Sequence, residues 1–520
     1  MIAALSHLAR LARAGFVLAR EGVFALPDPR QLPVPARAII KLARLIERPT
    51  SASVEHRLST ALTRLGPTYV KLGQFLATRP DVVGMALARD LETLQDKMPP
   101  FPQAEAEAAI AAALGKPVNE IYKSLGPPVA AASIAQVHRA EIETAAGRKP
   151  VAVKVLRPGI EHRARVELDA FTFAAKAGET LSAEARRLRL IETVNTLRRS
   201  VAIEMDLRLE AAALSEMAEN TKDDPDFRVP TVDWDRTAKD VLTLDWIDGA
   251  PLNDRARLDA MGLDLKKLAA AVIQTFLRHA LRDGFFHADM HPGNLFVDAG
   301  GKLTAVDFGI MGRLGPKERR FLAEILYGFI TRNYRRTAEV HFEAGYVPSQ
   351  HSIDDFAQAI RAIGEPIHNR TAEDISMAKL LMLLFEVTSL FDMRTRPELL
   401  LLQKTMVVVE GVARSLDPKL DMWTVSEPVV REWMERHLGP AGRIEDAAKD
   451  ATSFLAGVPS LMTRGALLVE QLDVITRDGL VLAPETVAAI GRAEARRSRA
   501  TVIALWAIAV LLVWIVWRIL

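Results

Sequence analysis

The feature that most constrains this 520-residue chain is a cluster of acidic, amide and histidine side chains between positions 287 and 309. The segment reads His287-Ala-Asp289-Met-His291-Pro-Gly-Asn294, then Leu-Phe-Val, a turn at 298–301, and Ala-Val-Asp307-Phe308-Gly309. Asn294 follows Asp289 by five residues and Asp307 follows it by eighteen, which leaves room for one hairpin. The fold must therefore bring these side chains together across a short hairpin.

These residue types at this spacing favour phosphoryl transfer. That chemistry needs a carboxylate to orient the nucleophile and oxygen ligands to hold Mg²⁺ against the phosphates. Kinase-like enzymes carry them on a loop of the pattern H-x-D-x-x-x-x-N and on a D-F-G turn, separated by a hairpin. Asp289 then corresponds to the catalytic carboxylate, and Asn294 and Asp307 correspond to the metal ligands.

A rival interpretation is a transition-metal site. His287, Asp289 and His291 alternate, so on a strand all three would face one side and could bind a metal. Pro292 and Gly293 favour a loop instead, and a metal site leaves the D-F-G turn unexplained.

A lysine upstream fits the same chemistry. Val151-Ala-Val-Lys154 is typical of the strand whose lysine contacts the α- and β-phosphates. Such a lysine needs a carboxylate partner from a helix. We favour Glu204 as this partner, with Asp206 and Glu210 as alternates.

The remaining nucleotide-binding elements are a hinge and a loop. The segment Asp245-Trp-Ile247 occupies the position between two lobes, where the main chain would receive adenine. The glycine-rich loop expected ahead of Lys154 is replaced by Val129, Ala130, Ala131, Ala132, Ser133, Ile134, Ala135, Gln136 and Val137. An alanine Cβ restricts both positive φ and close approach of the backbone to phosphate. We therefore expect a stiffer loop and an altered nucleotide preference, towards the diphosphate.

Two further segments depart from an ordinary protein kinase. Residues 307–320 contain no Ser, Thr or Tyr, and Pro316 is expected to begin a helix, so no long activation segment is predicted. Lys71-Leu-Gly73-Gln74 is expected on a helix, where Lys71 and Gln74 share one face. Spacing alone predicts only a surface lysine there.

Composition limits the class of protein. The chain has no cysteine, which excludes disulfides, thiolate metal sites and cysteine nucleophiles. The net charge is +2, from 67 basic and 65 acidic residues, so nucleic acid is not an expected partner.

The two ends of the chain carry candidate membrane segments. Residues 500–517 are uncharged and long enough, at about 27 Å of helix, to span a bilayer. The arginines just before them predict that the main body is cytoplasmic. Residues 1–20 fit equally a basic membrane-surface helix and an ordinary surface helix.

Together the motifs resemble those of the UbiB family of atypical kinase-like proteins, from about residue 55 to 420. They are K-x-G-Q (Lys71, Gly73, Gln74), L-Q-D-x-x-P-P-F-P (94–102), S-I-A-Q-V-H (133–138), V-A-V-K-V-x-R-P-G (151–159), E-x-D with R-L-E-A-A (204–212), H-A-D-x-H-P-G-N (287–294) and D-F-G (307–309).

The resemblance implies binding of Mg²⁺ with ATP or ADP, ATPase activity, and support of ubiquinone biosynthesis at the bacterial inner membrane. It implies that the helix bearing Lys71 and Gln74 folds over the active site and excludes protein substrates, which reverses the expectation from spacing. The implied catalytic residues are Asp289, Lys154, Glu204, Lys71 and Gln74, with Asn294 and Asp307 as metal ligands. The implied partners are membrane lipid, prenylated phenol or quinone intermediates and quinone-biosynthetic enzymes, and a homodimer is left open.

Two functional classes stay in competition. The first is a membrane-anchored ATPase or a kinase acting on a small molecule or a protein. The second is a nucleotide-gated scaffold for the biosynthetic enzymes, without turnover. The phosphoryl acceptor, whether water, lipid or protein, is not named by the sequence.

The expected fold is α+β, a two-lobed protein-kinase-like fold with an N-terminal helical extension and a C-terminal transmembrane helix. The expected domains are the extension (1–117), the N-lobe (118–248), the C-lobe (249–420), a helical region (421–499) and the anchor (500–520).

Overall fold

The structure is a computed structural model that describes only part of the chain. The described residues are 2–23, 45–48, 56–77, 98–367, 386–388, 390–393 and 397–439, with 83, 87, 90, 91 and 94. The chain divides into two compact units, 1–434 and 435–520, and the account below concerns the first. The membrane span predicted at 500–520 lies outside the described residues. Within the described part, no helix is both long and apolar enough to cross a membrane.

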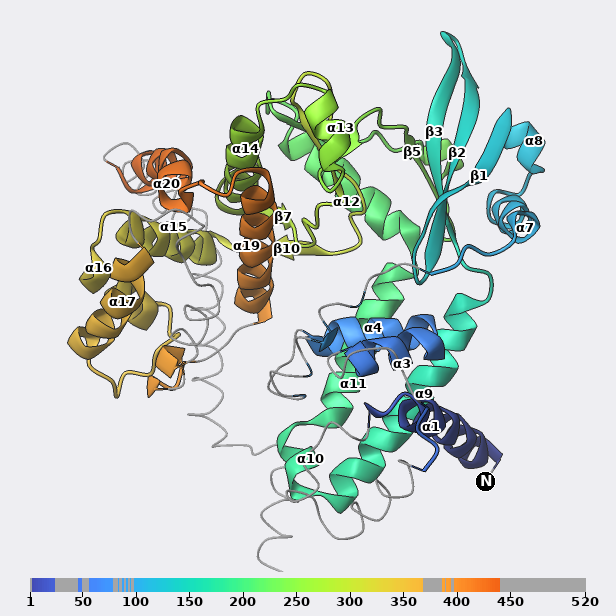
Figure 1. The fold of residues 1–520 in the computed structure, drawn as a ribbon, viewed down its shortest axis with the longest axis horizontal. Coiled ribbons are helices and arrows are strands. Elements are labelled where there is room, and N and C mark those ends of the chain that lie inside the picture. Colours follow the sequence, from blue (N-terminus) through green and yellow to red (C-terminus); the bar gives the residue numbers. More distant parts are fainter. Residues whose placement is uncertain are drawn as a thin grey trace, which may run out of the picture. The chain divides into compact units, whose positions relative to one another are not determined.

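A four-stranded antiparallel sheet forms the first lobe (Figure 1). Its strands, in spatial order, are β1 (Ser124–Ala131), β2 (Ala135–Thr144), β3 (Gly147–Leu156) and β5 (Val241–Asp245). The strand predicted from the alternation of Val151, Val153 and Val155 is confirmed, and all three valines are buried. They share one face because alternate residues of a strand point the same way. Lys154, paired in register with Val137, therefore points to the opposite face.

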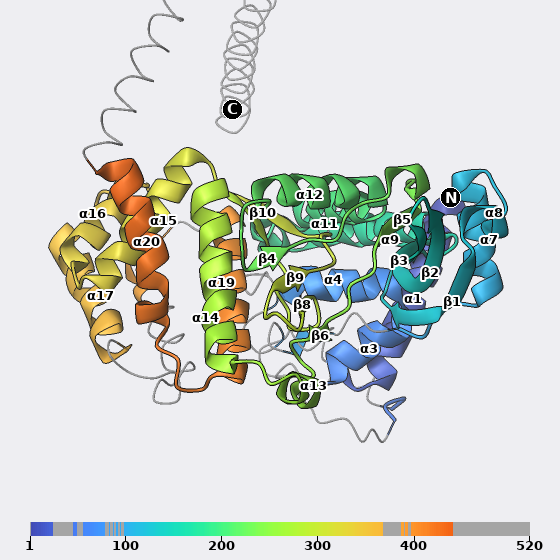
Figure 2. The same ribbon diagram turned by 90° about the horizontal axis from the view of Figure 1, so that it is seen from above.

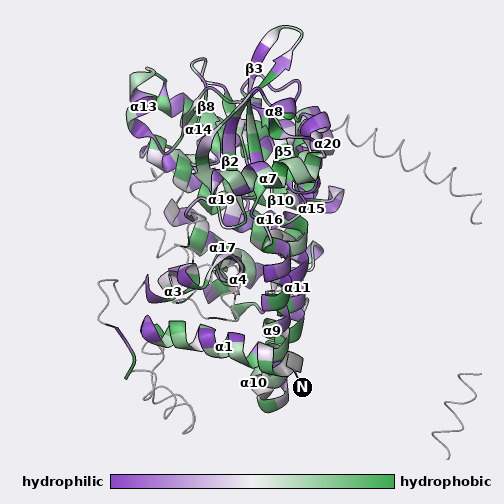
Figure 3. Cartoon of the chain, turned by 90° about the vertical axis from the view of Figure 1, so that its right-hand side faces the viewer, coloured by the Kyte–Doolittle hydropathy of each residue, from purple (hydrophilic) through white to green (hydrophobic). Residues whose placement is uncertain are grey.

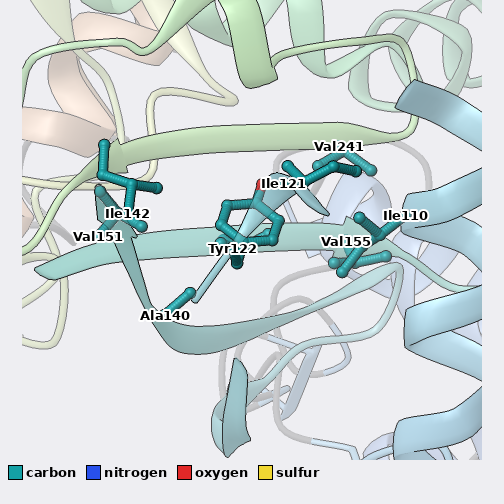
Figure 4. Packing of buried hydrophobic residues seen from close by; sticks show 9 residues of the cluster. Ile110, Ile121, Tyr122, Ala140, Ile142, Val151, Val155 and Val241 are labelled. Carbon is teal, nitrogen blue, oxygen red and sulfur yellow. The ribbon is translucent and has the colours of Figure 1, made fainter. Parts of the chain in front are cut away.

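The core of this lobe lies between the valine face of the sheet and two helices, α7 (Gln103–Leu114) and α8 (Val118–Ile121) (Figure 4). Ile110 and Ile121 pack there against β3 and β5. Tyr122 is almost completely buried, and its hydroxyl lies 2.7 Å from that of Thr243, so neither polar group is left without a partner. Because packing occupies this face, the face that bears Lys154 is left for the functional site.

A run of helices follows β3 along the chain. They are α9 (Ile160–Leu181), α10 (Ala183–Arg187), α11 (Leu190–Glu204) and α12 (Leu207–Asn220). The break between α11 and α12 is fixed by Asp206, whose carboxylate accepts a hydrogen bond from the backbone N–H of Arg208 at 3.2 Å. Glu204 and Glu210 consequently belong to different helices.

Three N-terminal helices precede the first lobe: α1 (Ile2–Arg20), α3 (Arg57–Leu65) and α4 (Pro67–Ala77). Helices α1 and α4 pack against α9, and α3 packs against α1 and α4. Helix α4 also lies beside α11 (Figure 1). It approaches α3 closely because Gly73 has no side chain: an added Cβ would lie 2.7 Å from Leu62 Cδ1 and would overlap Leu94. Helix α1 exposes Leu5 and Phe16, and both hydrophilic and hydrophobic residues occur along it (Figure 3).

The second lobe is mainly helical. Its helices are α13 (Arg255–Ala260), α14 (Leu265–Arg278), α15 (Pro316–Ile330), α16 (Tyr334–Glu343), α17 (Ile353–Ile367), α19 (Pro397–Leu416) and α20 (Met422–Leu438). Helices α14 and α19 lie side by side in two perpendicular views (Figures 1 and 2). A π-helical turn, η5 (His279–Asp283), follows α14 directly.

Short strands complete this lobe. One sheet has the order β4 (Phe227–Arg228), β9 (Leu303–Ala305), β8 (Leu295–Val297) and β6 (Ala250–Pro251), and β10 (Met311–Arg313) pairs with β7 (Phe285–His287). The predicted hairpin between Asn294 and Asp307 is confirmed as β8 and β9. Its turn is held by the Asp298 carboxylate, which accepts hydrogen bonds from the N–H groups of Gly300 and Lys302, each at 2.9 Å.

Gly284 joins η5 to β7 in a left-handed conformation, with φ +65°, and an added Cβ would overlap the carbonyl oxygen of Leu314. We expect Gly284→Ala to lower the free energy of unfolding by roughly 2–3 kcal/mol, because it adds a backbone overlap to the cost of positive φ. Gly262 is a matched control, with the same φ of +65° and nothing within 4 Å of an added Cβ. There Ala should cost only about 1 kcal/mol. Equal losses in urea denaturation would show that the contact with Leu314 has no effect.

Candidate functional site

Lys154 is the centre of an ion cluster that joins three elements. Its Nζ on β3 donates to both carboxylate oxygens of Glu210 on α12, at 2.8 and 2.9 Å, and to Oδ1 of Asp307 at 3.0 Å. Glu210 Oε1 also accepts a hydrogen bond from the backbone N–H of Phe308 at 3.2 Å. Burial alone would lower the pKa of Lys154, but the carboxylates of Asp307 and Glu210 outweigh it and raise that pKa well above its usual value. The lysine therefore stays cationic.

The favoured partner for Lys154 was wrong: one of the two alternates, Glu210, pairs with it. Glu204 instead binds Lys71 of α4, with 2.6 Å between Lys71 Nζ and Glu204 Oε2. The reason is the helix break, because Glu204 ends α11 beside α4 whereas Glu210 lies in the first turn of α12, next to β3. Asp206, the other alternate, caps α12 and pairs with Arg208.

His287 supports the loop that carries Asp289. Its Nε2 donates to the carbonyl oxygen of Val306 at 3.1 Å, and its Nδ1 accepts from the backbone N–H of Asp289 at 3.1 Å. Both bonds are made at once by a neutral imidazole with its proton on Nε2. Burial lowers the pKa of His287, which agrees with that neutral form. The ring therefore ties β7 to the segment that precedes Asp307.

Asp289 and Asn294 are held together by hydrogen bonds. The amide nitrogen of Asn294 donates to the backbone carbonyl of Asp289 at 3.1 Å and to its Oδ2 at 3.3 Å. This orientation leaves the amide oxygen of Asn294 available as a ligand. Among the described residues, no cluster of three or more His, Cys, Asp or Glu side chains could hold a metal ion, so the transition-metal interpretation of His287, Asp289 and His291 finds no support there.

Asp307 lies in a strained turn. Its φ is +61°, which non-glycine residues adopt uncommonly, and Phe308 beside it is buried against the ring of His287 at 5.0 Å between centroids. The charge of Lys154 lowers the pKa of Asp307 to about 2, against the effect of burial and with help from Lys71. The carboxylate is therefore ionised at neutral pH, and its side chain is 47% exposed.

The segment after Asp307 is short, as predicted. Strand β10 follows almost at once, and α15 begins at Pro316. Arg313 of β10 forms a bidentate ion pair with Glu216 of α12, at 2.7 and 2.5 Å. No long activation segment separates Asp307 from α15, and α12 contacts both ends of this short connection.

The alanine-rich segment predicted as a loop is mostly strand: residues 129–131 end β1 and residues 135–137 begin β2, so that only 132–134 form the turn of the loop. Of its predicted nucleotide-binding residues, those that line a cleft beside Lys154 are Val129, Ala130, Ala131, Ala132, Ile134, Ala135 and Val137. Ser133 and Gln136 are 0% and 1% exposed and are absent from the walls of the cleft. Gln136 links the loop to the preceding segment, because its Oε1 accepts a hydrogen bond from the backbone N–H of Phe101 at 2.9 Å.

The same cleft collects the other predicted site residues. Its walls include Lys71, Gln74, Lys154, Glu204, Asp245, Ile247, Asp289, Asn294 and Asp307. Asp245 ends β5 and forms an ion pair with Lys149 at 2.6 Å. The polar groups at the cleft thus include two lysines, carboxylates and side-chain amides. Carboxylate and amide oxygens suit Mg²⁺ that is shared between a few protein ligands and phosphate oxygens. Asn294 and Asp307 are the residues that fit such an ion.

Sequence reasoning missed a contact with the loop of Asp289. The hydroxyl of Thr405 on α19, fully buried, shares its single proton between the backbone carbonyl of Ala288 at 3.1 Å and that of Leu401 at 2.8 Å. The N–H of Ala288 donates to Ile310 at 3.1 Å, so the peptide before Asp289 is held on both sides. No local pattern signals this contact, because more than one hundred residues separate its two partners.

Comparison with known families identifies two regions. Residues 93–341 match the ABC1 atypical kinase-like domain, and residues 360–421 match the UbiB helical domain. A protein of Marinobacter nauticus named "Probable protein kinase UbiB" is 39% identical over 464 residues, which cover 88% of this chain and 84% of the relative. Proteins of the same name in Azotobacter vinelandii and Xanthomonas axonopodis pv. citri are 39% and 37% identical, covering 79% and 87% of this chain and 76% and 83% of the relatives.

Among solved structures, the complex of Rv3197 with erythromycin from Mycobacterium tuberculosis is similar in fold. It matches with a TM-score of 0.52 and 24% identity, over 76% of this chain and 97% of that one. The likeness supports the kinase-like α+β fold.

Proposed function

The chain belongs to the UbiB family of ABC1 atypical kinase-like proteins, and we propose that it binds Mg-nucleotide and hydrolyses ATP in support of ubiquinone biosynthesis. The observation that carries the proposal is the ion cluster of Lys154, Glu210 and Asp307 beside Asp289 and Asn294 in one cleft. A protein that only bound nucleotide would have no use for Asp289, whose carboxylate accepts a hydrogen bond from Asn294 at 3.3 Å.

Each residue of the site has a role in the proposed reaction. Lys154 is cationic and would contact the α- and β-phosphates, with Glu210 fixing its position. Mg²⁺, held by Asn294 and Asp307, would supply charge neutralisation at the phosphates. Asp289 would orient an attacking oxygen and accept its proton while the bond from the γ-phosphorus to the ADP oxygen breaks. The neutral His287 holds the Asp289 backbone through its Nδ1.

The proposal for the phosphoryl acceptor rests on the elements that lie at the cleft. The Lys71–Glu204 ion pair joins α4 to the end of α11 at the cleft, and the connection from Asp307 to the start of α15 at Pro316 is too short to form a long activation segment. We therefore favour water or a small molecule over a protein in trans as the phosphoryl acceptor. The proposed site of action is the bacterial inner membrane, with the body cytoplasmic and residues 500–520 as a single-pass anchor. Prenylated phenol intermediates and quinone-biosynthetic enzymes are the proposed partners.

The test is phosphate release from Mg-ATP by the full chain in anionic liposomes, with and without a prenylated phenol analogue. Turnover that lipid or the phenol stimulates supports an ATPase coupled to the quinone pathway. Nucleotide binding without turnover in every condition would contradict it and support the scaffold, which the stiff alanine-rich loop and the Lys71–Glu204 pair favour.

The contact of Thr405 with Ala288 gives a second prediction. Thr405→Val keeps the shape of the side chain and removes its hydroxyl, so the Ala288 carbonyl loses a donor and the Asp289 loop is less well held. We expect phosphate release to fall about tenfold with nucleotide affinity unchanged, and Thr405→Ser to restore it. Thr337→Val is the matched control, because Thr337 is equally buried and its hydroxyl donates to the carbonyl oxygen of Asn333 at the start of its own helix. A similar fall in both valine variants would point to general destabilisation.

A further inference from the structure

A short segment before the first lobe is fastened to the alanine-rich loop. We name residues 98–101 the strap. The backbone N–H of Met98 donates to the carbonyl oxygen of Ala131 at 3.2 Å. At the other end, the Gln136 side chain bonds both backbone groups of Phe101, accepting from its N–H at 2.9 Å and donating to its carbonyl at 3.4 Å. The strap therefore runs along the loop and is joined to it at both ends.

Arg157 completes this attachment in the middle. Its Nε and Nη2 donate to the carbonyl oxygen of Ala132 at 3.2 and 2.9 Å, and Nη2 also donates to the carbonyl oxygen of Pro99 at 2.8 Å. The backbone N–H of Arg157 donates to Ile134 at 2.8 Å. The guanidinium lies over the ring of Phe101, 5.4 Å from its centroid. One side chain thus contacts the turn of the loop, the strap and its aromatic residue.

Arginine is the side chain suited to this position. Its guanidinium is rigid and always charged, presents several donors in one plane and stacks on aromatic rings, whereas lysine offers a single point charge on a flexible stem. Hydrogen bonds from a charged donor are also stronger than neutral ones. Arg157 follows directly after β3, three residues beyond Lys154, so one strand orients both the lysine and the anchor of the loop.

We propose that Arg157 is a positioning residue, which fastens the alanine-rich loop to the strap and thereby sets the relative affinity of the site for ATP and ADP. The inference rests on the proposed nucleotide-binding function. Ala131 and Ala132 line the cleft and Arg157 does not, so an effect of Arg157 on nucleotide would pass through the loop. Ala131→Gly would free the backbone of the loop directly and is expected to raise the affinity for ATP relative to ADP. Loss of Arg157 should loosen the loop and shift the affinities in the same direction.

The first experiment is hydrogen exchange on the full chain without nucleotide, and it tests the attachment alone. In Arg157→Gln, the amides of Met98, Phe101 and Ala132 should exchange about tenfold faster than in the wild type. Arg157→Lys should behave in the same way, since lysine cannot reproduce the planar fork. Arg236→Gln is the matched control: Arg236 also donates to a backbone carbonyl, that of Ile121 at 3.3 Å, in the same lobe. Unchanged exchange in Arg157→Gln, or full protection in Arg157→Lys, would overturn the assignment.

The second experiment is calorimetry with Mg-ATP and Mg-ADP. Arg157→Gln should shift the ratio of the two dissociation constants towards ATP by about fivefold, a change that general destabilisation would not produce. In the Ala131→Gly background the same substitution should have little further effect, because the loop is already loosened. A wild type that binds neither nucleotide would refute the proposed function. A wild type that binds both, with faster exchange but an unchanged ratio in Arg157→Gln, would refute only the role assigned to Arg157.

Discussion

Replacement of Asp289 by asparagine is expected to lower phosphate release from Mg-ATP by about 10²–10⁴-fold and to leave nucleotide affinity almost unchanged. The carboxylate is the only group that the proposal asks to accept a proton from the attacking oxygen. Asparagine keeps the size of the side chain and an oxygen that can still accept the hydrogen bond from Asn294, now at 3.3 Å from Asp289 Oδ2. The loss should therefore appear in turnover and not in folding or binding.

Turnover and affinity must be measured on the same preparations of Asp289→Asn, by phosphate release in anionic liposomes and by calorimetry. Asp235→Asn is a suitable control, because Asp235 is exposed and lies outside the cleft. A variant that binds Mg-ATP as the wild type does, but turns it over a hundredfold or more slowly, would support Asp289 as the proton acceptor. Wild-type turnover would exclude Asp289 from the chemistry.

Replacement of Asp307 by asparagine is expected to abolish the part of nucleotide stabilisation that depends on Mg²⁺. At a hundredfold excess over its dissociation constant, Mg-ATP should stabilise the wild type by about 2.7 kcal/mol. The variant should retain only the stabilisation seen with nucleotide and EDTA. The ion cluster survives the change in part, because Lys154 keeps both bonds to Glu210. A thermal shift in Mg-ATP equal to that of the wild type would remove Asp307 from the metal site.

The low pKa of Asp307 predicts how the effect of Asp307→Asn on stability depends on pH. The charge of Lys154 depresses that pKa to about 2 from an ordinary value of 3.8. A depressed carboxylate pKa gives a contribution to stability that is present above the unfolded value and is lost as the pH falls towards 2. The difference in stability between the wild type and Asp307→Asn should accordingly be constant from pH 6 to 8. A steep change in that interval would point to another group.

The sequence was sufficient wherever the signal is local. Alternation at Val151, Val153 and Val155 predicted β3 because a strand repeats every two residues. Proline at 316 predicted the start of α15, since the first helical position needs no N–H donor. The hairpin between Asn294 and Asp307 followed from spacing alone.

Partners across the fold could not be predicted in the same way. Glu204 and Glu210 are six residues apart in a stretch that is helical throughout except at Met205 and Asp206. That short break decides which glutamate pairs with Lys154. Helix propensity does not predict where the break falls. Thr405 likewise reaches Ala288 only because α19 packs beside α14. These contacts depend on how helices are placed, which no single segment encodes.

The attachment of α12 has a consequence for control. In many kinases the corresponding helix swings outward and breaks its lysine pair, and activity follows that movement. Here α12 is bound by Glu210 to Lys154 and to the Phe308 N–H, and by Glu216 to Arg313, on both sides of the D-F-G turn. The Arg313–Glu216 pair is exposed and contributes little to stability by itself, but it helps to fix the orientation of α12. An outward swing would have to break both attachments together. Under the proposed function, α12 would already stand in its catalytic position, and control of the rate would fall to what enters the cleft.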